Sequence, residues 1–110
     1  MTNFYQYETG RLKVSIGNPN PMPIGVGVTA TLSTAAAVFV MAVGPVYYTI
    51  AANSEIAPVF EFPFAGMSGE YVPRVIVFDA LTEVTLFDGW GTDKAYVYAA
   101  GITIVSVTWI

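Results

Sequence analysis

The sequence has no cysteine and no histidine among its 110 residues. Without cysteine, the chain can have neither a disulfide framework nor thiol chemistry. Histidine is the commonest general base and the commonest metal ligand, so its absence removes the usual equipment for both roles. A serine nucleophile would then need a lysine as its base, and Lys13 and Lys94 both stand where ordinary strands are expected to begin. We therefore predict that the protein is not an enzyme and that it binds no cofactor and no metal.

Charge is also scarce. Charged residues make up 11% of the chain, against about 25% in ordinary proteins. The net charge is −4, and the four cations are scattered, so they cannot neutralise a run of phosphates and nucleic acid is excluded as a partner. Hydrophobic residues reach 55%, which forces apolar area onto the surface. Such a surface predicts a homo-oligomer or another protein that covers it.

A long stretch without charge runs from Val14 to Ser54, and residues 24–52 within it form the only membrane candidate. Threonine and serine interrupt this stretch, and Gly44-Pro45 breaks it. The basic residues that would anchor a membrane helix are missing after it. These features favour two buried strands. Membrane insertion through residues 24–52 stays open as a second alternative. The N-terminus lacks the basic and apolar parts of a signal peptide.

Period-two alternation of apolar and polar residues recurs along the chain and is typical of strands. Leu12, Val14 and Ile16 alternate with polar residues, and three phenylalanines alternate over residues 59–64. Strands are expected at residues 11–16, 26–32, 38–43, 46–50, 59–64, 71–78, 84–87, 95–99 and 102–110. About eight short strands with glycine and proline between them predict an all-β fold, which would be a β-sandwich, a jelly roll or a barrel.

Three prolines and a glycine give local detail. Gly44-Pro45 indicates either a tight connection between two strands or a bulge in one bent strand. Pro63 and Pro73 cannot donate a ladder hydrogen bond, so an edge position is expected for residues 59–64 and for the start of residues 71–78.

Residues 1–23 are expected to form an extended N-terminal arm that precedes a single β domain over residues 24–110. Prolines in alternate positions stiffen the end of the arm. We interpret the aromatic and apolar residues of this arm as an interface, made of Phe4, Tyr5, Tyr7, Leu12, Val14 and Ile16. Two alternatives are open: the arm docks on a neighbouring subunit, or it folds onto its own domain.

Residues 88–93 (DGWGTD) are the most distinctive local feature. Two carboxylates on a glycine-bent loop could hold Ca²⁺, but a hairpin loop explains the same residues without metal. The acidic residues of the chain stand at strand ends or beside turns, where solvated acids are normal, which argues against catalysis by paired carboxylates. Trp90 is a candidate interface residue, although it could also stack on a sugar or cover its own core.

The chain is small, has no cysteine or histidine and few charges, and is rich in threonine, valine, alanine and tyrosine. With an extended arm before a β domain, it resembles the small virion proteins of tailed bacteriophages, above all the capsid decoration, or cement, proteins. The resemblance lies in composition and architecture and supplies no site residues. It implies a non-enzymatic protein, commonly a trimer, that stabilises a shell by packing against other capsid proteins. Its location would be the virion, and the host cytoplasm during assembly.

A different class of function stays open as the first alternative. The chain could be a carbohydrate-binding or receptor-binding β module of a tail or fibre, with Trp90 and nearby tyrosines as its contact residues.

Overall fold

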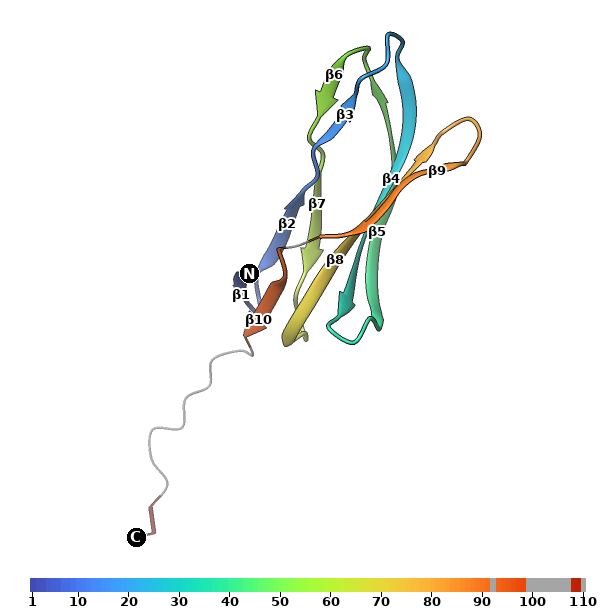
Figure 1. Cartoon of the computed structure of the whole chain (residues 1–110). Helices are drawn as coiled ribbons and strands as arrows, with labels where there is room; N and C mark the ends of the chain where they lie inside the picture. Colours follow the sequence, from blue (N-terminus) through green and yellow to red (C-terminus); the bar gives the residue numbers. More distant parts are fainter. Residues whose placement is uncertain (92, 99–107, 110) are drawn as a thin grey trace.

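The computed structural model describes residues 1–91, 93–98 and 108–109, and in this part of the chain it contains strands and no helix (Figure 1). The prediction of an all-β fold is therefore confirmed. The strands are β1 (Thr2–Tyr5), β2 (Thr9–Lys13), β3 (Ile16–Asn18), β4 (Ile24–Thr34), β5 (Phe39–Ile50), β6 (Ser54–Ile56), β7 (Val59–Pro63), β8 (Gly69–Asp79), β9 (Thr85–Trp90) and β10 (Ala95–Tyr98).

Six strands form the main sheet. Its order is β1-β10-β8-β4-β5, and β9 also pairs with β8. Strands β10 and β9 share one edge of β8, because β10 pairs with residues 69–71 and β9 pairs with residues 74–78. The β1–β10 pair is parallel, and the other pairs of this sheet are antiparallel.

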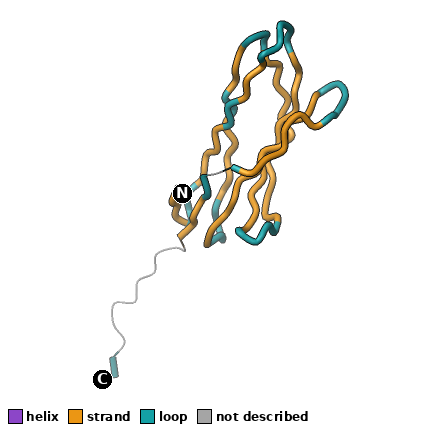
Figure 2. Tube along the Cα trace, in the orientation of Figure 1, coloured by secondary structure: helices purple, strands orange, loops and turns teal. Residues whose placement is uncertain are grey.

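A two-stranded ribbon forms the second layer and crosses one face of the main sheet (Figures 1 and 2). Strand β2 pairs with β7, and β3 pairs with β6, both antiparallel. The Val14 amide donates a 2.9 Å hydrogen bond to the Pro58 carbonyl and so joins the two pairs into one continuous ribbon. The result is a β-sandwich with unequal layers, in which four short strands form a layer two strands wide over the six-stranded sheet.

Alternating residues fill the space between the layers. From β4 come Val26, Val28, Ala30 and Leu32, each at most 3% exposed. From the ribbon side come Phe60, Phe62 and Phe64, each 2% exposed. Because side chains in a strand point to opposite faces in turn, the period-two pattern in the sequence predicts this inward set directly.

Residues 24–52, the membrane candidate, form the antiparallel hairpin of β4 and β5. The described part of the chain holds no helix that is long and apolar enough to cross a membrane. Gly44-Pro45 lies inside β5 opposite a register shift between Val28 and Ala30, so the bulge is the correct alternative. Gly44 has φ +105°, and a Cβ there would lie 2.6 Å from the Val28 carbonyl oxygen, which explains why glycine occupies this position.

The two proline predictions have different outcomes. Pro63 ends β7, which in the described structure pairs only with β2, so the edge position is confirmed. The edge position expected for Pro73 is wrong, because β8 lies in the centre of the main sheet. Pro73 is tolerated because β9 ends at Trp90 and β10 begins at Ala95 on either side of it along β8. Its carbonyl accepts a hydrogen bond from the Gly91 amide at 2.7 Å on that side, where the missing N–H also falls.

Residues 1–23, the expected arm, fold onto the chain's own domain, which was the second of the two alternatives. They supply β1 to the main sheet and β2 and β3 to the ribbon. Pro19, Pro21 and Pro23 lie in the connection between β3 and β4. Of the strand expected at residues 102–110, only Thr108 and Trp109 are described, and they lie outside any strand; the other residues lie outside the described part of the chain.

Candidate functional site

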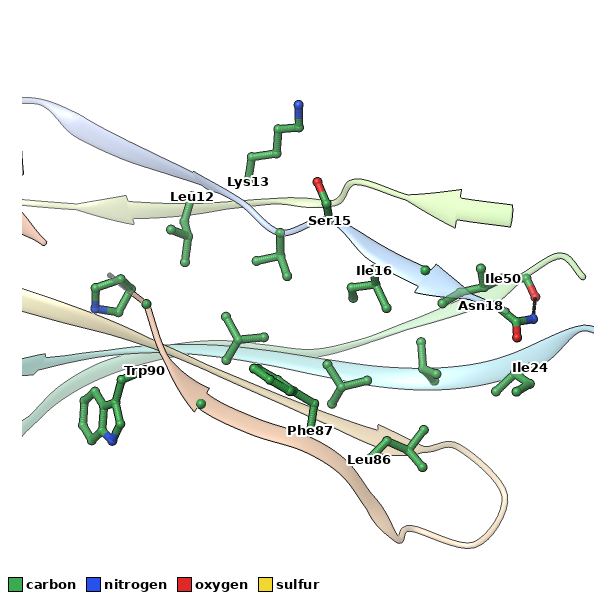
Figure 3. A pocket seen from close by; sticks show the side chains of 18 of the residues that line it. Leu12, Lys13, Ser15, Ile16, Asn18, Ile24, Ile50, Leu86, Phe87 and Trp90 are labelled. Atoms are coloured by element: carbon green, nitrogen blue, oxygen red, sulfur yellow. Dashed lines mark hydrogen bonds between the residues drawn. The ribbon is translucent and has the colours of Figure 1, made fainter. Parts of the chain in front are cut away.

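A groove of about 570 Å³ opens between the ribbon and the part of the main sheet made by β8 and β9 (Figure 3). Its lining is mostly apolar. Two buried residues, Val26 and Ile50, form part of its floor. The groove is the place where the two-stranded layer is too narrow to cover the six-stranded sheet.

Strands β2 and β3 form one wall of the groove. Leu12 and Ile16 point into the space above the main sheet, whereas Lys13 and Ser15 point away from it (Figure 3). Leu12, Val14 and Ile16 are only half-buried, although they continue the row of inward residues on the ribbon. The apolar face predicted over residues 11–16 therefore exists, but its outer side has no cover in the described structure.

Strands β8 and β9 form the other wall. Val75 and Val77 line it from β8, and Phe87 and Gly89 line it from β9. Phe87 is 56% exposed, which is unusual for a large apolar side chain that faces the interior of a sandwich. A Cβ at position 89 would lie 2.6 Å from the Phe87 ring, so glycine at this position leaves room for the ring.

The strands beside the groove also have unpaired backbone edges. Within the described residues, β2 pairs only with β7, β3 only with β6, and β9 only with β8. An edge of this kind presents a row of free N–H and C=O groups that can hydrogen-bond to another strand. The groove therefore offers apolar side chains and backbone hydrogen-bonding groups together.

Trp90 borders one end of the groove, but its ring lies beside Arg74, which is on the outer face of β8 because Val75 and Val77 face inward. The Arg74 guanidinium lies 5.3 Å from the centre of the Trp90 ring, within the range of a cation–π interaction. Asp88 accepts two hydrogen bonds from the same guanidinium, at 2.7 and 2.6 Å. Arg74 therefore joins β8 to β9 on the outer face.

Two carboxyl groups of the β8–β9 hairpin have perturbed pKa values. The hydrogen bond from Arg74 lowers the pKa of Asp88, and the hydrogen bond to Asp88 raises the pKa of Arg74. At the turn, backbone N–H groups of Thr82 and Leu81 donate to the Asp79 carboxylate at 3.0 and 2.8 Å, and they lower its pKa. Both perturbations stabilise the hairpin in its charged form.

The prediction of a hairpin loop over residues 88–93 is wrong for residues 88–90, because these residues belong to strand β9. Asp88 and Asp93 also have separate partners. Asp93 accepts a hydrogen bond from the Thr2 hydroxyl at 2.8 Å and lies 3.5 Å from the N-terminal amine. No group of three or more potential metal ligands occurs in the part of the chain that the structure describes. These contacts give the two aspartates structural roles at opposite ends of the expected loop.

The interface residues predicted from the sequence fall into two groups. Leu12, Val14, Ile16 and Trp90 meet at the groove. Phe4, Tyr5 and Tyr7 lie elsewhere, near the end of the sandwich where β1 is found. Phe4 packs against Phe64 with ring centres 4.9 Å apart, whereas Tyr5 and Tyr7 are exposed.

Val75, Val77 and Phe87 were not predicted as site residues. Their alternation indicates strands, but no pattern in the sequence shows that these particular residues line a groove, with Val77 buried and Phe87 56% exposed.

Comparison of the chain with protein-family models, with curated proteins and with solved structures gives no match. The site must therefore be interpreted from its own geometry.

Proposed function

We propose that this chain is a non-enzymatic structural protein of a virion, which stabilises a shell as a homo-oligomer in the manner of capsid decoration proteins. The observation that supports this function best is the groove with its unpaired edges. It is a surface that can bind another β-strand, because its lining is mostly apolar and its walls include free strand edges in the described structure.

The energetics of burial favour a covered groove. Burying apolar surface contributes about 25 cal/mol per Å², and Leu12, Val14, Ile16 and Phe87 all keep apolar surface in contact with water. A second exposed edge points in the same direction. Strand β5 pairs only with β4 in the described structure, contains no charged residue, and exposes Phe39 and Tyr47. Edges without charged residues favour pairing with other chains.

The oligomeric state and the location of the native protein test this proposal. Sedimentation equilibrium of the full chain at micromolar concentration should give a homo-oligomer, and a trimer would match the resemblance to decoration proteins. In a density gradient of the native source material, an antibody against the chain should find it in the fractions that contain large particles. A stable monomer that is present only in the free-protein fractions would contradict the proposal.

Trp90 is the residue on which the carbohydrate-binding alternative depends. It is 48% exposed, so a sugar could reach part of the ring. The Arg74 guanidinium already lies against the ring, however, and Asp88 holds that guanidinium in place. The ring is therefore part of a structural contact, and the geometry favours the structural function.

A further inference from the structure

We infer that the groove is filled by the C-terminal segment, residues 102–110, of a second copy of this chain, which adds a third strand to the ribbon. This inference rests on the proposed function and deepens it, because it names the segment through which one subunit packs on the next.

The groove has the size and the surroundings of a position that one further β-strand would fill. On one side it has the unpaired edge of β2 and β3, and below it are the inward side chains Val75, Val77 and Phe87. A strand that pairs with this edge would place every second side chain on these residues and would expose the others. Addition of a strand to a free edge is a common way for one chain to bind another.

Within the C-terminal segment 102–110 (sequence ITIVSVTWI), residues 105–109 have the alternating pattern that this place requires. They include no charged residue and are rich in β-branched residues, which favour strands. Over residues 105–109, Val105, Val107 and Trp109 fall on one face of a strand, and Ser106 and Thr108 fall on the other. The first face suits the apolar groove, and the second suits a surface beside Lys13 and Ser15.

The length of the segment also fits. Nine residues in a strand span about 30 Å, at about 3.3 Å per residue. The ribbon edge from Leu12 to Asn18 has seven residues, so it spans about 23 Å by the same measure. The whole segment is therefore long enough to reach along the edge, and the alternating residues 105–109 span about 17 Å of it.

The direction of β10 favours a second copy as the source. Ala95 lies opposite Tyr71, and Val97 lies opposite Gly69. The chain thus runs along β8 away from Pro73, Val75 and Val77, which line the groove. Trp109, the largest side chain of the segment, is fully exposed and so does not pack on its own domain. A neighbouring copy can receive the segment without a reversal of the chain.

Disulfide trapping tests the inference directly, because the natural chain has no cysteine and every disulfide must come from an introduced pair. One full-length sample carries Ser15→Cys, and a second carries Ser106→Cys. A parallel pair uses Thr108→Cys in place of Ser106→Cys, because the register along the edge is not fixed. After mixing, unfolding, refolding together and mild oxidation, we expect a disulfide-linked dimer of one Ser15→Cys chain and one Ser106→Cys or Thr108→Cys chain.

Two controls accompany the trapping. Val107→Cys lies on the opposite face of the segment and should form much less of the dimer with Ser15→Cys. Thr49→Cys, an exposed position on β5, should form little dimer with either segment variant. In addition, Val107→Asp, which places a charge on the apolar face, should abolish self-association in sedimentation while circular dichroism retains its β signal.

Each other outcome overturns the inference in a distinguishable way. If the full chain self-associates, but without the dimer and without sensitivity to Val107→Asp, then the inference is wrong and the proposed function survives through another surface. If a third sample, which carries Ser15→Cys and Ser106→Cys in one chain, gives only a disulfide within that chain, then the segment fills the groove of its own copy. If the full chain is a monomer and no disulfide forms between copies, then both the inference and the homo-oligomeric function fail.

Discussion

The two ends of the sandwich interior are built from the same two layers but are filled differently. At one end, three phenylalanines of the ribbon lie against the alternating residues of β4 and are almost completely buried. At the other end, Leu12, Val14 and Ile16 lie above Val75, Val77 and Phe87 and leave a groove of about 570 Å³. The phenylalanine end leaves a small hollow of about 90 Å³, lined in part by Phe62 and Phe64, whereas the core at the groove end is open on one side.

The difference follows from side-chain size and from the number of strands. Large aromatic rings let a ribbon of two strands cover a wide sheet, since each ring buries about 150–250 Å². Smaller aliphatic side chains at the same spacing cannot reach across to β9. One alternating pattern can therefore produce either a closed core or an open groove, depending on the size of the side chains that the two-stranded layer turns toward the wider sheet.

The largest expected effect is at the phenylalanine end. Phe60→Ala should lower the free energy of unfolding by about 3–5 kcal/mol, the range for removing a fully buried phenylalanine side chain. Urea denaturation followed by circular dichroism measures this loss. A loss well below this range would show that the phenylalanine end is also open in solution, and the contrast between the two ends would disappear.

A smaller effect is expected directly across the ribbon, where Leu12 pairs with Phe60. In an isolated subunit, Leu12→Ala should cost about 1 kcal/mol, because a half-buried leucine loses roughly half of the burial energy of a buried one. Lys13→Ala is the matched control, because its side chain points away from the groove, and it should change stability by less than about 0.5 kcal/mol. If a second copy covers the groove, then the loss caused by Leu12→Ala grows with protein concentration, whereas the loss caused by Phe60→Ala grows much less.

The all-β class and most of the inward residues could be predicted from the sequence, because both depend on local alternation. Phe60, Phe62 and Phe64 show this most clearly: their spacing places them on one face, and all three are buried. The prolines were harder to interpret. Pro73 has the edge signal of Pro63, but its missing donor falls between β10 and β9, and only the long-range pairing of β8 reveals that position.

Only one part of the candidate site, its apolar face on residues 11–16, could be predicted from the sequence. The apolar face of Leu12, Val14 and Ile16 is a local property of the sequence, and so is the pattern of residues 102–110. The groove itself depends on the pairing of β2 and β3, which in the described residues contact only β7 and β6, and this pairing is a property of the topology. The fold of residues 1–23 onto their own domain also depends on long-range pairs, such as Phe4 with Val97, that lie far apart in the sequence.

The smallest expected effect concerns the attachment of β9, which forms one wall of the groove and pairs with a single strand in the described structure. Its two perturbed carboxyl groups, Asp88 and Asp79, both have a lowered pKa in the folded chain. Their contribution to stability is therefore complete above the unfolded value of about 3.9. It is lost as the pH falls through the lower pKa values of the folded state. Acid should consequently loosen the β8–β9 hairpin while the phenylalanine end stays packed.

Trp90 fluorescence reports this loosening when Trp109→Phe removes the other tryptophan of the chain. As the pH falls below about 3.9 and through the lowered pKa values of Asp88 and Asp79, the Trp90 emission should shift as the Arg74–Asp88 contact breaks. Asp88→Asn should give much of the shifted emission already at neutral pH and should flatten the acid response, because the bidentate ion pair is absent from the start. Asp79→Asn is the matched control in the same hairpin and should keep most of the response. An unchanged acid response in Asp88→Asn would mean that Arg74 does not hold β9 in place, and that the wall of the groove depends on backbone pairing alone.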